Sequence, residues 1–577
     1  MNNVNDINNK LVFVFKIILI LLLIIFVRLF YLQISLNDKL SLLGKRNFTR
    51  IAKVASPRGN ITDYNGHLLA TNRQVINIYW RGTGNKQFDP EQLELINNLQ
   101  TITHSEFTPE DLIKIKVTER YSRNSLLFKD IPFEKLSQIL EKLSASPNLE
   151  IETKFQRYYT HKSLASHVIG YLSQIDEETI GKMGLEKILE DNLKGQPGQT
   201  QTTINSLGKN LKKEQILIPE CGKTIRTTLD LHLQKIAEEI FPPDYKGSLI
   251  LMDPRTGSIR ALLSRPNFDS GLFLKKLSLQ DWQDFQETQP FLNRAFNACY
   301  PPASIFKLVT VTAALDSGLI KRESNWNCRG FITYCGRKYH CNKLEGHGLL
   351  TTVNAVGLSC NPFFYEIAKH LEIDTLADYA NRFGLGQKTG VIFSEEEGLI
   401  PTSKWKRKTL KEKWWRGETL SAVIGQSYLL VTPIQIARMI SGIFEGYLIK
   451  PRILEDQPIE KSILNIRPDV LQFLREAMRI SATIGTAQRA GRIRDIMVYG
   501  KTGTAQTISF ETQGDSMEKS EHAWFGSNIA YKDEPSLTLI ILIEKAGHSR
   551  IATEVAKQFL LRYKKLMVDL EKASRPL

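Results

Sequence analysis

The sequence predicts an α+β protein in which helices sandwich an antiparallel sheet, preceded by an elongated α+β region and one membrane-spanning helix. Three observations lead to this class. An apolar segment of 22 residues lies near the N-terminus. Strand-like runs occur at both ends of the C-terminal half around a helical middle, so distant segments are expected to pair in one sheet. At 577 residues the chain is long enough for more than one domain.

Composition and charge narrow the class of partner. The chain is 42% hydrophobic and 24% charged, as in an ordinary globular protein, and its formal net charge is +15. Such an excess of basic residues suits an anionic surface, an anionic polymer or a nucleic acid. The apolar N-terminal segment favours a membrane-anchored protein among these, so we expect no nucleic-acid partner.

The N-terminal segment is predicted to be an uncleaved membrane anchor. Leu11–Leu32 is apolar apart from two basic residues, and this length can cross a bilayer. A cleaved signal peptide is the alternative, but no small-x-small cleavage site follows, and Phe30-Tyr31 is typical of an aromatic interface belt. We therefore assign residues 1–10 to a cytoplasmic tail and residues 11–33 to a single transmembrane helix.

Residues 34–222 are predicted to form a non-catalytic α+β region, which we call the pedestal. The Asn65-Gly66 pair stands between strand-like runs and predicts a tight hairpin. Strand and helix patterns follow, such as Val75–Trp80 and Leu136–Leu143, without a cluster of catalytic residue types. We therefore expect the pedestal to be a scaffold or docking module.

Residues 223–577 are predicted to form the second domain. A capped helix ends near Ile240, and Ser248–Leu263 has the pattern of a hairpin around an Asp-Pro turn. Helices dominate from Ser304 to Arg479. Strands and a last amphipathic helix then follow at 496–500, 523–528, 537–544 and 553–565.

The chemistry of the chain is predicted to centre on Ser304. Two prolines precede this serine, and Lys307 follows one helical turn later. A hydroxyl beside an amine at a helix start has the parts of an activated nucleophile, because the amine takes the proton and backbone N–H groups hold an oxyanion. Ser-x-x-Lys occurs three more times in the chain, so this pattern alone is weak evidence. Two downstream motifs strengthen it: Ser359-Cys360-Asn361 and Lys501-Thr502-Gly503.

This set of three motifs resembles the signature of penicillin-binding proteins and serine β-lactamases. Further motifs resemble class B penicillin-binding proteins in particular: Tyr300-Pro301-Pro302, Ile424-Gly425-Gln426, His522–Gly526, Arg58-Gly59, Asp63–Gly66 and Gly184-x-Glu186. Within this class, Gly346-His347-Gly348 and the aromatic residues after Asn361 resemble the elongation-specific penicillin-binding protein 2. Two small departures are Ala303 and Ser427, which stand where the family usually has glycine.

The resemblance implies a catalytic role for each signature residue. Ser304 would attack a D-alanyl-D-alanine terminus with Lys307 as the base, which requires a lowered pKa of that lysine. Ser359 would pass the proton to the leaving D-alanine. The amide of Asn361 would hold substrate and Lys307, and a helix N-cap before Pro362 is its alternative role.

The segment around Lys501 is expected to be an edge strand that pairs with an extended substrate peptide. Its lysine and threonine side chains would receive the substrate carboxylate, and the backbone N–H groups of Ser304 and Thr504 would form the oxyanion hole. The expected substrate-binding residues are Thr502, Gly503, Thr504 and Trp524. Trp524 would wall the cleft, although a core position fits its pattern nearly as well. A second Lys-Thr-Gly, at 388–390, follows a helix-ending run and is predicted to be a turn.

The implied reaction is a two-step acyl transfer of the D,D-carboxypeptidase type that cross-links peptidoglycan stem peptides and is blocked by β-lactams. It would need no cofactor. By the same resemblance, the catalytic domain would be periplasmic and anchored in the inner membrane. Its expected partners are a SEDS-type glycosyltransferase and elongation-complex proteins, bound through the pedestal. The alternatives are a division-specific class B transpeptidase, a β-lactam sensor or β-lactamase of the same fold, and a catalytically silent scaffold.

The chain has six cysteines, for which disulfides are the default outside the cytoplasm. Four residues instead offer the ligand types of a tetrahedral structural zinc site: Cys328, Cys341, His347 and Cys360. Some proteins that resemble penicillin-binding protein 2 carry a metal here, held by a histidine and the middle residue of Ser-x-Asn. Zinc would then pin the Ser-Cys-Asn loop. A Cys328–Cys341 disulfide is the main alternative, and Cys335 and His340 are substitute ligands.

Overall fold

The computed structural model describes residues 2–143, 146–175, 178–204, 210–274, 277–506 and 521–573. These residues form two compact units, and successive segments of the chain belong to one unit and then to the other. Unit 1 comprises Met1–Arg58, Asn72–Gln156 and Lys194–Gly222, and unit 2 comprises Gly59–Thr71, Arg157–Leu193 and Lys223–Leu577. Two stretches of the predicted pedestal therefore fold with the C-terminal domain, because their strands and turns pair with it.

Unit 1 begins with the predicted anchor. Helix α1 (Asn2–Phe30) runs into a π-helical turn, η1 (Tyr31–Ser35), and α2 (Asn37–Phe48) follows. The segment Asn9–Ser35 has a mean hydropathy of 3.0, and no part of it is buried. An exposed apolar helix of this length supports a single-pass membrane anchor.

The folded part of unit 1 contains two sheets and three helices. One sheet has the order β1-β8-β9, formed by Thr49–Val54, Gly198–Ile204 and Asn210–Leu217. In the other, the C-terminal part of β3 (Leu68–Arg81) pairs with β4 (Asn124–Phe128) and β5 (Leu149–Tyr159). The helices are α3 (Pro90–Thr103), α4 (Pro109–Arg120) and α5 (Phe133–Leu143). Trp80 is fully buried among them and donates its indole N–H to Glu119.

Unit 2 is built on a five-stranded antiparallel sheet in the order β12-β11-β21-β20-β19. The strands are Ile259–Arg265, Gly247–Met252, Leu537–Ile543, Glu521–Tyr531 and Ile496–Gln506. Side chains on β11 alternate between two cores. Leu249 and Leu251 pack towards α9 (Leu231–Ile240) and α20 (Arg550–Ala573), whereas Ile250 and Met252 join the larger core on the other face. The predicted α+β sandwich is confirmed.

The larger core includes α11 (Lys307–Asp316), α12 (Thr352–Gly357), α13 (Asn361–Ala368), α17 (Pro433–Glu445) and α18 (Pro468–Thr483). The first two signature motifs end at the first residues of α11 and α13. The remaining elements of unit 2 are β2 (Ile61–Thr62), α6 (Ser166–Ile169), β6 (Leu172–Ile175), β7 (Glu178–Gly181), α7 (Gly184–Ile188), α8 (Glu190–Leu193), β10 (Ile225–Arg226), η2 (Ser270–Leu274), α10 (Leu279–Thr288), η3 (Ala303–Ile305), α14 (Ile373–Arg382), α15 (Ser403–Thr409), α16 (Arg416–Ala422), β17 (Tyr447–Ile449), β18 (Lys461–Ile463) and α19 (Gln488–Gly491).

The predicted helical middle of unit 2 also contains strands, and four of them lie near the cysteines. β13 (Asn325–Cys328) pairs with β16 (Gly348–Thr351), and β14 (Phe331–Tyr334) pairs with β15 (Arg337–His340). These two strand pairs lie in a region where helices were predicted to dominate, and they bring the cysteines near one another. The second Lys-Thr-Gly, at 388–390, lies in a loop outside any helix or strand, as predicted.

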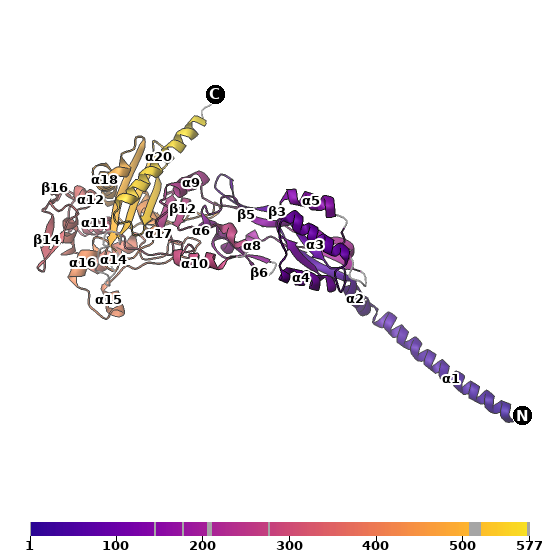
Figure 1. Cartoon of the computed structure of the whole chain (residues 1–577). Helices are drawn as coiled ribbons and strands as arrows, with labels where there is room; N and C mark the ends of the chain where they lie inside the picture. The colour runs from indigo at the N-terminus through magenta and orange to yellow at the C-terminus, as the bar shows by residue number, and fades with distance from the viewer. Residues whose placement is uncertain are drawn as a thin grey trace. The chain divides into compact units, whose positions relative to one another are not determined.

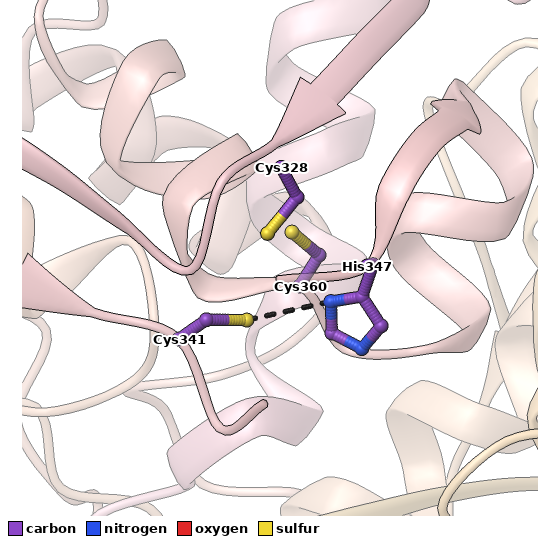
Figure 2. Close-up of side chains that lie close together, drawn as sticks. All are labelled: Cys328, Cys341, His347 and Cys360. Carbon is purple, nitrogen blue, oxygen red and sulfur yellow. Dashed lines mark hydrogen bonds between the residues drawn. The ribbon is translucent and has the colours of Figure 1, made fainter. Parts of the chain in front are cut away.

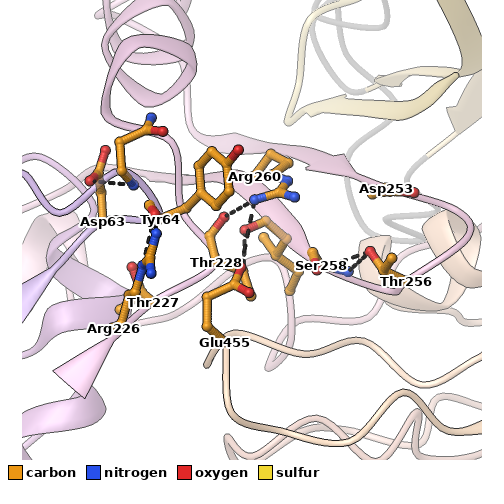
Figure 3. Close-up of polar contacts among 12 residues, drawn as sticks. Asp63, Tyr64, Arg226, Thr227, Thr228, Asp253, Thr256, Ser258, Arg260 and Glu455 are labelled. Atoms are coloured by element: carbon orange, nitrogen blue, oxygen red, sulfur yellow. Dashed lines mark hydrogen bonds and ion pairs between the residues drawn. The ribbon is translucent and has the colours of Figure 1, made fainter. Parts of the chain in front are cut away.

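The Asn65-Gly66 hairpin forms as predicted, because β2 pairs antiparallel with the start of β3. Figure 3 shows the polar contacts around it. Buried Asp63 accepts backbone N–H groups from Asn65 and from Leu231, at the start of α9. Arg226 donates to the carbonyl of Tyr64. The hairpin thereby ties β2 to the first helix of the C-terminal domain.

A buried ion pair in unit 2 joins three parts of the predicted pedestal. The Nε of Arg157 donates to Oε1 of Glu186 at 2.7 Å, and Nη1 donates to the carbonyl of Gly59 at 2.7 Å. The two charged side chains are 1% and 0% exposed. Removal of one of these two buried charges would leave the other without a partner, which strongly destabilises a fold.

Glu186→Ala is expected to lower the free energy of unfolding by about 3–5 kcal/mol, because the Arg157 charge would remain buried without its partner. Urea unfolding of the full-length protein in detergent, followed by circular dichroism, measures the loss. The matched control replaces both charges, with Arg157→Met and Glu186→Leu, and should recover most of the stability. A double variant as unstable as the single one would contradict this account.

Candidate active site

Ser304 lies in the short 3₁₀ turn η3, immediately before α11 begins at Lys307. The sequence predicts a single α-helix from Ser304, but in the structure the first turn is a 3₁₀ turn and the α-helix begins at Lys307. Ala303, just before the serine, has φ of +50°, in the left-handed region that favours glycine. Ala303 is the first of the two departures from the family pattern. Because alanine has a Cβ atom, its left-handed backbone conformation costs about 1 kcal/mol.

Two glycines allow neighbouring segments to approach the nucleophile. A Cβ at Gly425 would lie 2.0 Å from the carbonyl oxygen of Ala303, and the Gly425 carbonyl accepts the Ala303 N–H at 2.9 Å. A Cβ at Gly503 would lie 3.2 Å from the Cβ of Ala303. The Ile-Gly-Gln segment and the Lys-Thr-Gly strand therefore both pack against the turn that carries Ser304.

The two signature lysines meet at one hydroxyl. Lys307 Nζ donates to Ser359 Oγ at 3.0 Å and to Asn361 Oδ1 at 2.6 Å, while Lys501 Nζ donates to the same Ser359 Oγ at 3.0 Å. Lys307 also donates to the Ser359 carbonyl, and Lys501 to the Thr502 carbonyl. The structure thus brings together all three motifs that lie far apart in the sequence.

Burial controls the charge of this lysine pair. Both amines are 0% exposed. Burial lowers the pKa of Lys307 to about 7, although the nearby thiols of Cys360 and Cys341 oppose that change. Burial, and then the charge of Lys307, lower the pKa of Lys501. Lys307 therefore has the depressed pKa that a base requires near neutral pH.

Asn361 is the first residue of α13, and Cys360 occupies the N-cap position. The side-chain oxygen of Asn361 accepts from Lys307, and its amide nitrogen donates to the His340 carbonyl. Of the two roles considered for Asn361, contact with Lys307 is the one its side chain makes. Ser359, just upstream, has φ of +55°, a second strained position in the site.

β19 is an edge strand and contains the whole Lys501–Thr504 motif, so it continues beyond the strand at 496–500 predicted from sequence. Its register places Gly503 opposite Trp524 on β20. The hydroxyl of Thr502 bonds with that of Thr486, and the hydroxyl of Thr504 accepts the Ser549 N–H at 3.3 Å. Among the described residues, no strand pairs with the other side of β19, which leaves that side for an extended peptide.

Trp524 lies in the core and not on an open cleft wall. It is 0% exposed, and its indole N–H donates to the Pro301 carbonyl at 3.0 Å. The burial corrects the placement expected from sequence, because β20 is an inner strand covered on both faces. Trp524 instead supports the segment that leads to Ser304.

Two residues that sequence reasoning missed also support this segment. Glu544, at the end of β21, accepts from the Tyr300 hydroxyl at 2.6 Å and from Arg294 Nε at 2.8 Å. Burial, and then the charge of Glu544, raise the pKa of Tyr300, so its hydroxyl stays protonated and donates. Tyr300-Pro301-Pro302 was recognised as a motif, but its partner could not be identified because Glu544 lies 244 residues away.

The predicted metal ligands gather at one place beside the active site. Figure 2 shows the side chains of Cys328, Cys341, His347 and Cys360 directed towards a common centre. Their ligand atoms all lie within 4.8 Å of one another, with Cys341 Sγ and His347 Nδ1 3.4 Å apart. Tetrahedral zinc with Zn–S bonds of about 2.3 Å would place sulfurs about 3.8 Å apart, so the four residues fit such an ion.

The thiols in this cluster are free. All six cysteines are unpaired, so the Cys328–Cys341 disulfide considered above is not formed, and the substitute ligand Cys335 is exposed. A hydrogen bond with Cys360 lowers the pKa of Cys341 to about 5 despite the opposing effect of burial. One thiolate is therefore favoured even before a cation is considered, and thiolates are the form that binds zinc.

The site combines a serine in a tight turn, a pair of buried lysines and an edge strand, which are the parts of a serine acyltransferase, and comparisons with known proteins identify its family. The family described as "Penicillin binding protein transpeptidase domain" matches residues 247–561. The family described as "Penicillin-binding Protein dimerisation domain" matches residues 53–227. The chain belongs to the class B penicillin-binding proteins.

Within this family the chain is most like penicillin-binding protein 2. It is 31% identical to the peptidoglycan D,D-transpeptidase MrdA of Acinetobacter baumannii, over 95% of this chain and 86% of that protein. It superposes on penicillin-binding protein 2 of Helicobacter pylori, solved in complex with MreC, with a TM-score of 0.77, 27% identity and coverage of 90% and 99%. A chain of a peptidoglycan synthase complex gives a TM-score of 0.74, 28% identity and coverage of 96% and 98%. The predicted family and subfamily are confirmed.

The rate constant of acylation by penicillin is expected to rise with pH through about 7 and then level off. Only neutral Lys307 can take the serine proton, and the pKa of Lys307 is lowered to about 7. The second-order rate constant, measured with a fluorescent penicillin between about pH 5.5 and 9, checks the sign. A rate that is flat or falls across neutrality would be inconsistent with a lysine base.

Proposed function

We propose that this chain is the peptidoglycan D,D-transpeptidase of cell elongation, acting through an acyl-enzyme on Ser304. One observation supports this most strongly: the amines of Lys307 and Lys501 both reach the Ser359 hydroxyl, beside the turn that carries Ser304. The similarity to MrdA over 95% of the chain favours the elongation enzyme over the division-specific alternative.

In the first step, Ser304 Oγ attacks the carbonyl carbon of the penultimate D-alanine of a donor stem peptide. Its proton passes to neutral Lys307, and the backbone N–H groups of Ser304 and Thr504 hold the negative charge on the carbonyl oxygen. The C–N bond to the last D-alanine then breaks. Its nitrogen receives the proton from Lys307 through the Ser359 hydroxyl, which contacts both lysines.

The donor peptide is held along β19 by its backbone, with its terminal carboxylate near Thr504 and Thr502. With Lys307 neutral, a protonated Lys501 would supply positive potential to that end of the site. Because Thr502 is nearly buried and bonds to Thr486, Thr504 is the more accessible of the two hydroxyls. Asn361 keeps its oxygen on Lys307 and offers to the substrate the amide N–H that does not donate to the His340 carbonyl.

In the second step, an amine of a neighbouring stem peptide attacks the ester carbonyl. Lys307, neutral again, takes the amine proton, and the Ser304–carbonyl bond breaks as an amide cross-link forms. Ser304 Oγ recovers a proton from Lys307. Transfer to water instead would give D,D-carboxypeptidase or β-lactamase activity. The relative named above is a D,D-transpeptidase, and the synthase complex named above coordinates polymerisation and cross-linking, which supports the amine acceptor.

We propose that the N-terminal side of the anchor is cytoplasmic and that the folded residues after the anchor are periplasmic, on the same side of the membrane as the peptidoglycan substrate. We propose residues 34–222 as the pedestal and residues 223–577 as the catalytic domain. The related structure with MreC supports a pedestal that binds elongation-complex proteins. Glycan polymerisation would be supplied by a membrane-embedded SEDS-type glycosyltransferase.

We also propose that the Cys328, Cys341, His347 and Cys360 cluster holds a structural zinc ion. Three thiols and an imidazole within 4.8 Å of one another fill a tetrahedral shell and leave no position for substrate. The ion would fix the loop in which Cys360 stands between Ser359 and Asn361. The chemistry of acyl transfer itself remains with the lysines and serines.

Ser304→Ala is expected to abolish covalent labelling by fluorescent penicillin, because no other residue can form the acyl-enzyme. Labelling of the full-length protein, followed by gel fluorescence and mass spectrometry, tests this. Ser516→Ala, in another Ser-x-x-Lys of the chain, is the control and should label normally. Labelling that persists in Ser304→Ala would refute the assignment, and rapid loss of the label from wild type would favour a β-lactamase.

The purified full-length protein is expected to contain about one zinc ion per chain by elemental analysis. Cys328→Ser should lose the ion, lower the melting temperature by several degrees and slow penicillin acylation, because the Ser359–Asn361 loop loosens. Cys335→Ser, at an exposed cysteine outside the cluster, is the matched control. Metal retained in Cys328→Ser, or a Cys328–Cys341 disulfide found after alkylation, would count against zinc.

A further inference from the structure

A basic, tryptophan-rich projection lies outside the catalytic cluster. We call residues 403–416 the basic projection. Its fourteen residues include seven basic side chains, only one acidic one, Glu412, and three of the chain's seven tryptophans. It begins with α15, ends where α16 starts, and lies at the margin of unit 2 (Figure 1). Such a concentration of charge does not arise from the needs of folding, because like charges repel in a compact fold.

Two of the tryptophans hold the projection to the body of unit 2. The rings of Trp405 and Trp414 lie 5.3 and 6.3 Å from the ring of Tyr428. The indole N–H of Trp414 donates to Thr419 Oγ1 at 2.9 Å. Buried Lys406 pairs with Glu412 and with Glu418. The base of the projection is therefore a packed structure.

The outer part of the projection presents cations and one aromatic ring. Lys404, Arg407, Lys408 and Lys411 are exposed, and none forms an ion pair within the part of the chain that the structure describes. The one acidic residue of the projection, Glu412, is already paired with Lys406. Trp415 is 54% exposed, with Lys413 Nζ 4.1 Å from the centre of its ring. This surface carries these four uncompensated positive charges and a fifth, Lys413, beside a tryptophan ring.

The projection is attached to the segment that borders the nucleophile. Tyr428, which supports both inner tryptophans, follows Gly425 by three residues. The carbonyl of Gly425 accepts the Ala303 N–H, and Tyr300 and Val431 exchange two backbone hydrogen bonds of 2.9 Å. A polymer bound to the projection would therefore be attached to the same backbone segment that lies beside Ser304.

We propose that the basic projection binds a peptidoglycan strand outside the catalytic cleft and so retains the polymer near Ser304. Stem peptides carry several carboxylates, which complement Lys404, Arg407, Lys408 and Lys411. The exposed ring of Trp415 offers a flat apolar face to a sugar of the glycan chain. This proposal rests on the proposed function, since it names a second contact for the same substrate.

The test compares two variants of the full-length protein in detergent, each losing four exposed positive charges. The projection variant is Lys404→Gln, Arg407→Gln, Lys408→Gln and Lys411→Gln. The control variant is Lys321→Gln, Lys461→Gln, Lys565→Gln and Lys572→Gln, at exposed positions elsewhere in unit 2. Both change the net charge from +15 to +11, because four positive charges are removed.

Binding of un-cross-linked peptidoglycan strands is measured at about 50 and about 300 mM salt. The projection variant should bind the strands about tenfold more weakly at low salt, as expected for the loss of four exposed ion pairs, and the control should stay within about twofold. The difference should shrink at high salt. Trp415→Ala should also weaken binding, while penicillin acylation of Ser304 stays unchanged in every variant.

Equal binding of strands by the projection and control variants would overturn the proposal. Strand binding unaffected by the projection, together with loss of binding to phosphatidylglycerol vesicles, would overturn it in favour of a membrane contact. Failure of the proposed function is distinguishable from either result, because penicillin would then leave Ser304 of the wild-type protein unlabelled.

Discussion

A single hydroxyl between two buried amines organises this enzyme. Ser359 Oγ has two acceptor positions and one proton, so it can accept from Lys501 while donating to neutral Lys307. If both lysines were protonated, both would need to donate to that oxygen at close range without water. Burial and mutual repulsion therefore favour one proton fewer on the pair. The sheet, the helices and the loops of unit 2 serve to keep these three groups together.

The arrangement requires strained backbone conformations near the active site. Ala303 and Ser359 have φ of +50° and +55°, and Ser427 has φ of +70°. The two departures from the family pattern, Ala303 and Ser427, thus stand at left-handed positions where glycine would be relaxed. Tight packing against Gly425 and Gly503 holds Ala303 in this conformation. Strain is tolerated here because the surrounding core is large, and a side chain at Ala303 limits the freedom of the turn that carries Ser304.

Much of the site could be predicted because its catalytic residue types occur in short sequence motifs. Ser304, Lys307, Ser359, Asn361 and Lys501 could be named from sequence, and the apolar run before Lys501 identified an edge strand. The rest depends on contacts between distant segments. The burial of Trp524 follows from the order of strands in the sheet, which no local pattern gives. The partnership of Tyr300 with Glu544 and the pairing of β13 with β16 are likewise non-local.

The position of Cys360 explains why a structural cluster stands so near the chemistry. Its neighbours Ser359 and Asn361 contact Lys307, yet Ser359 adopts a left-handed conformation that a free loop would leave. The other three members of the cluster come from β13, from the residue after β15 and from the residue before β16, so the hairpins converge behind the loop. An ion bound there would link those hairpins to the strained loop through short, directional bonds. Hydrophobic packing alone resists rotation of a small loop weakly, because it is non-directional. Four metal–ligand bonds would resist it strongly, and the Ser359 hydroxyl would stay between its two amines.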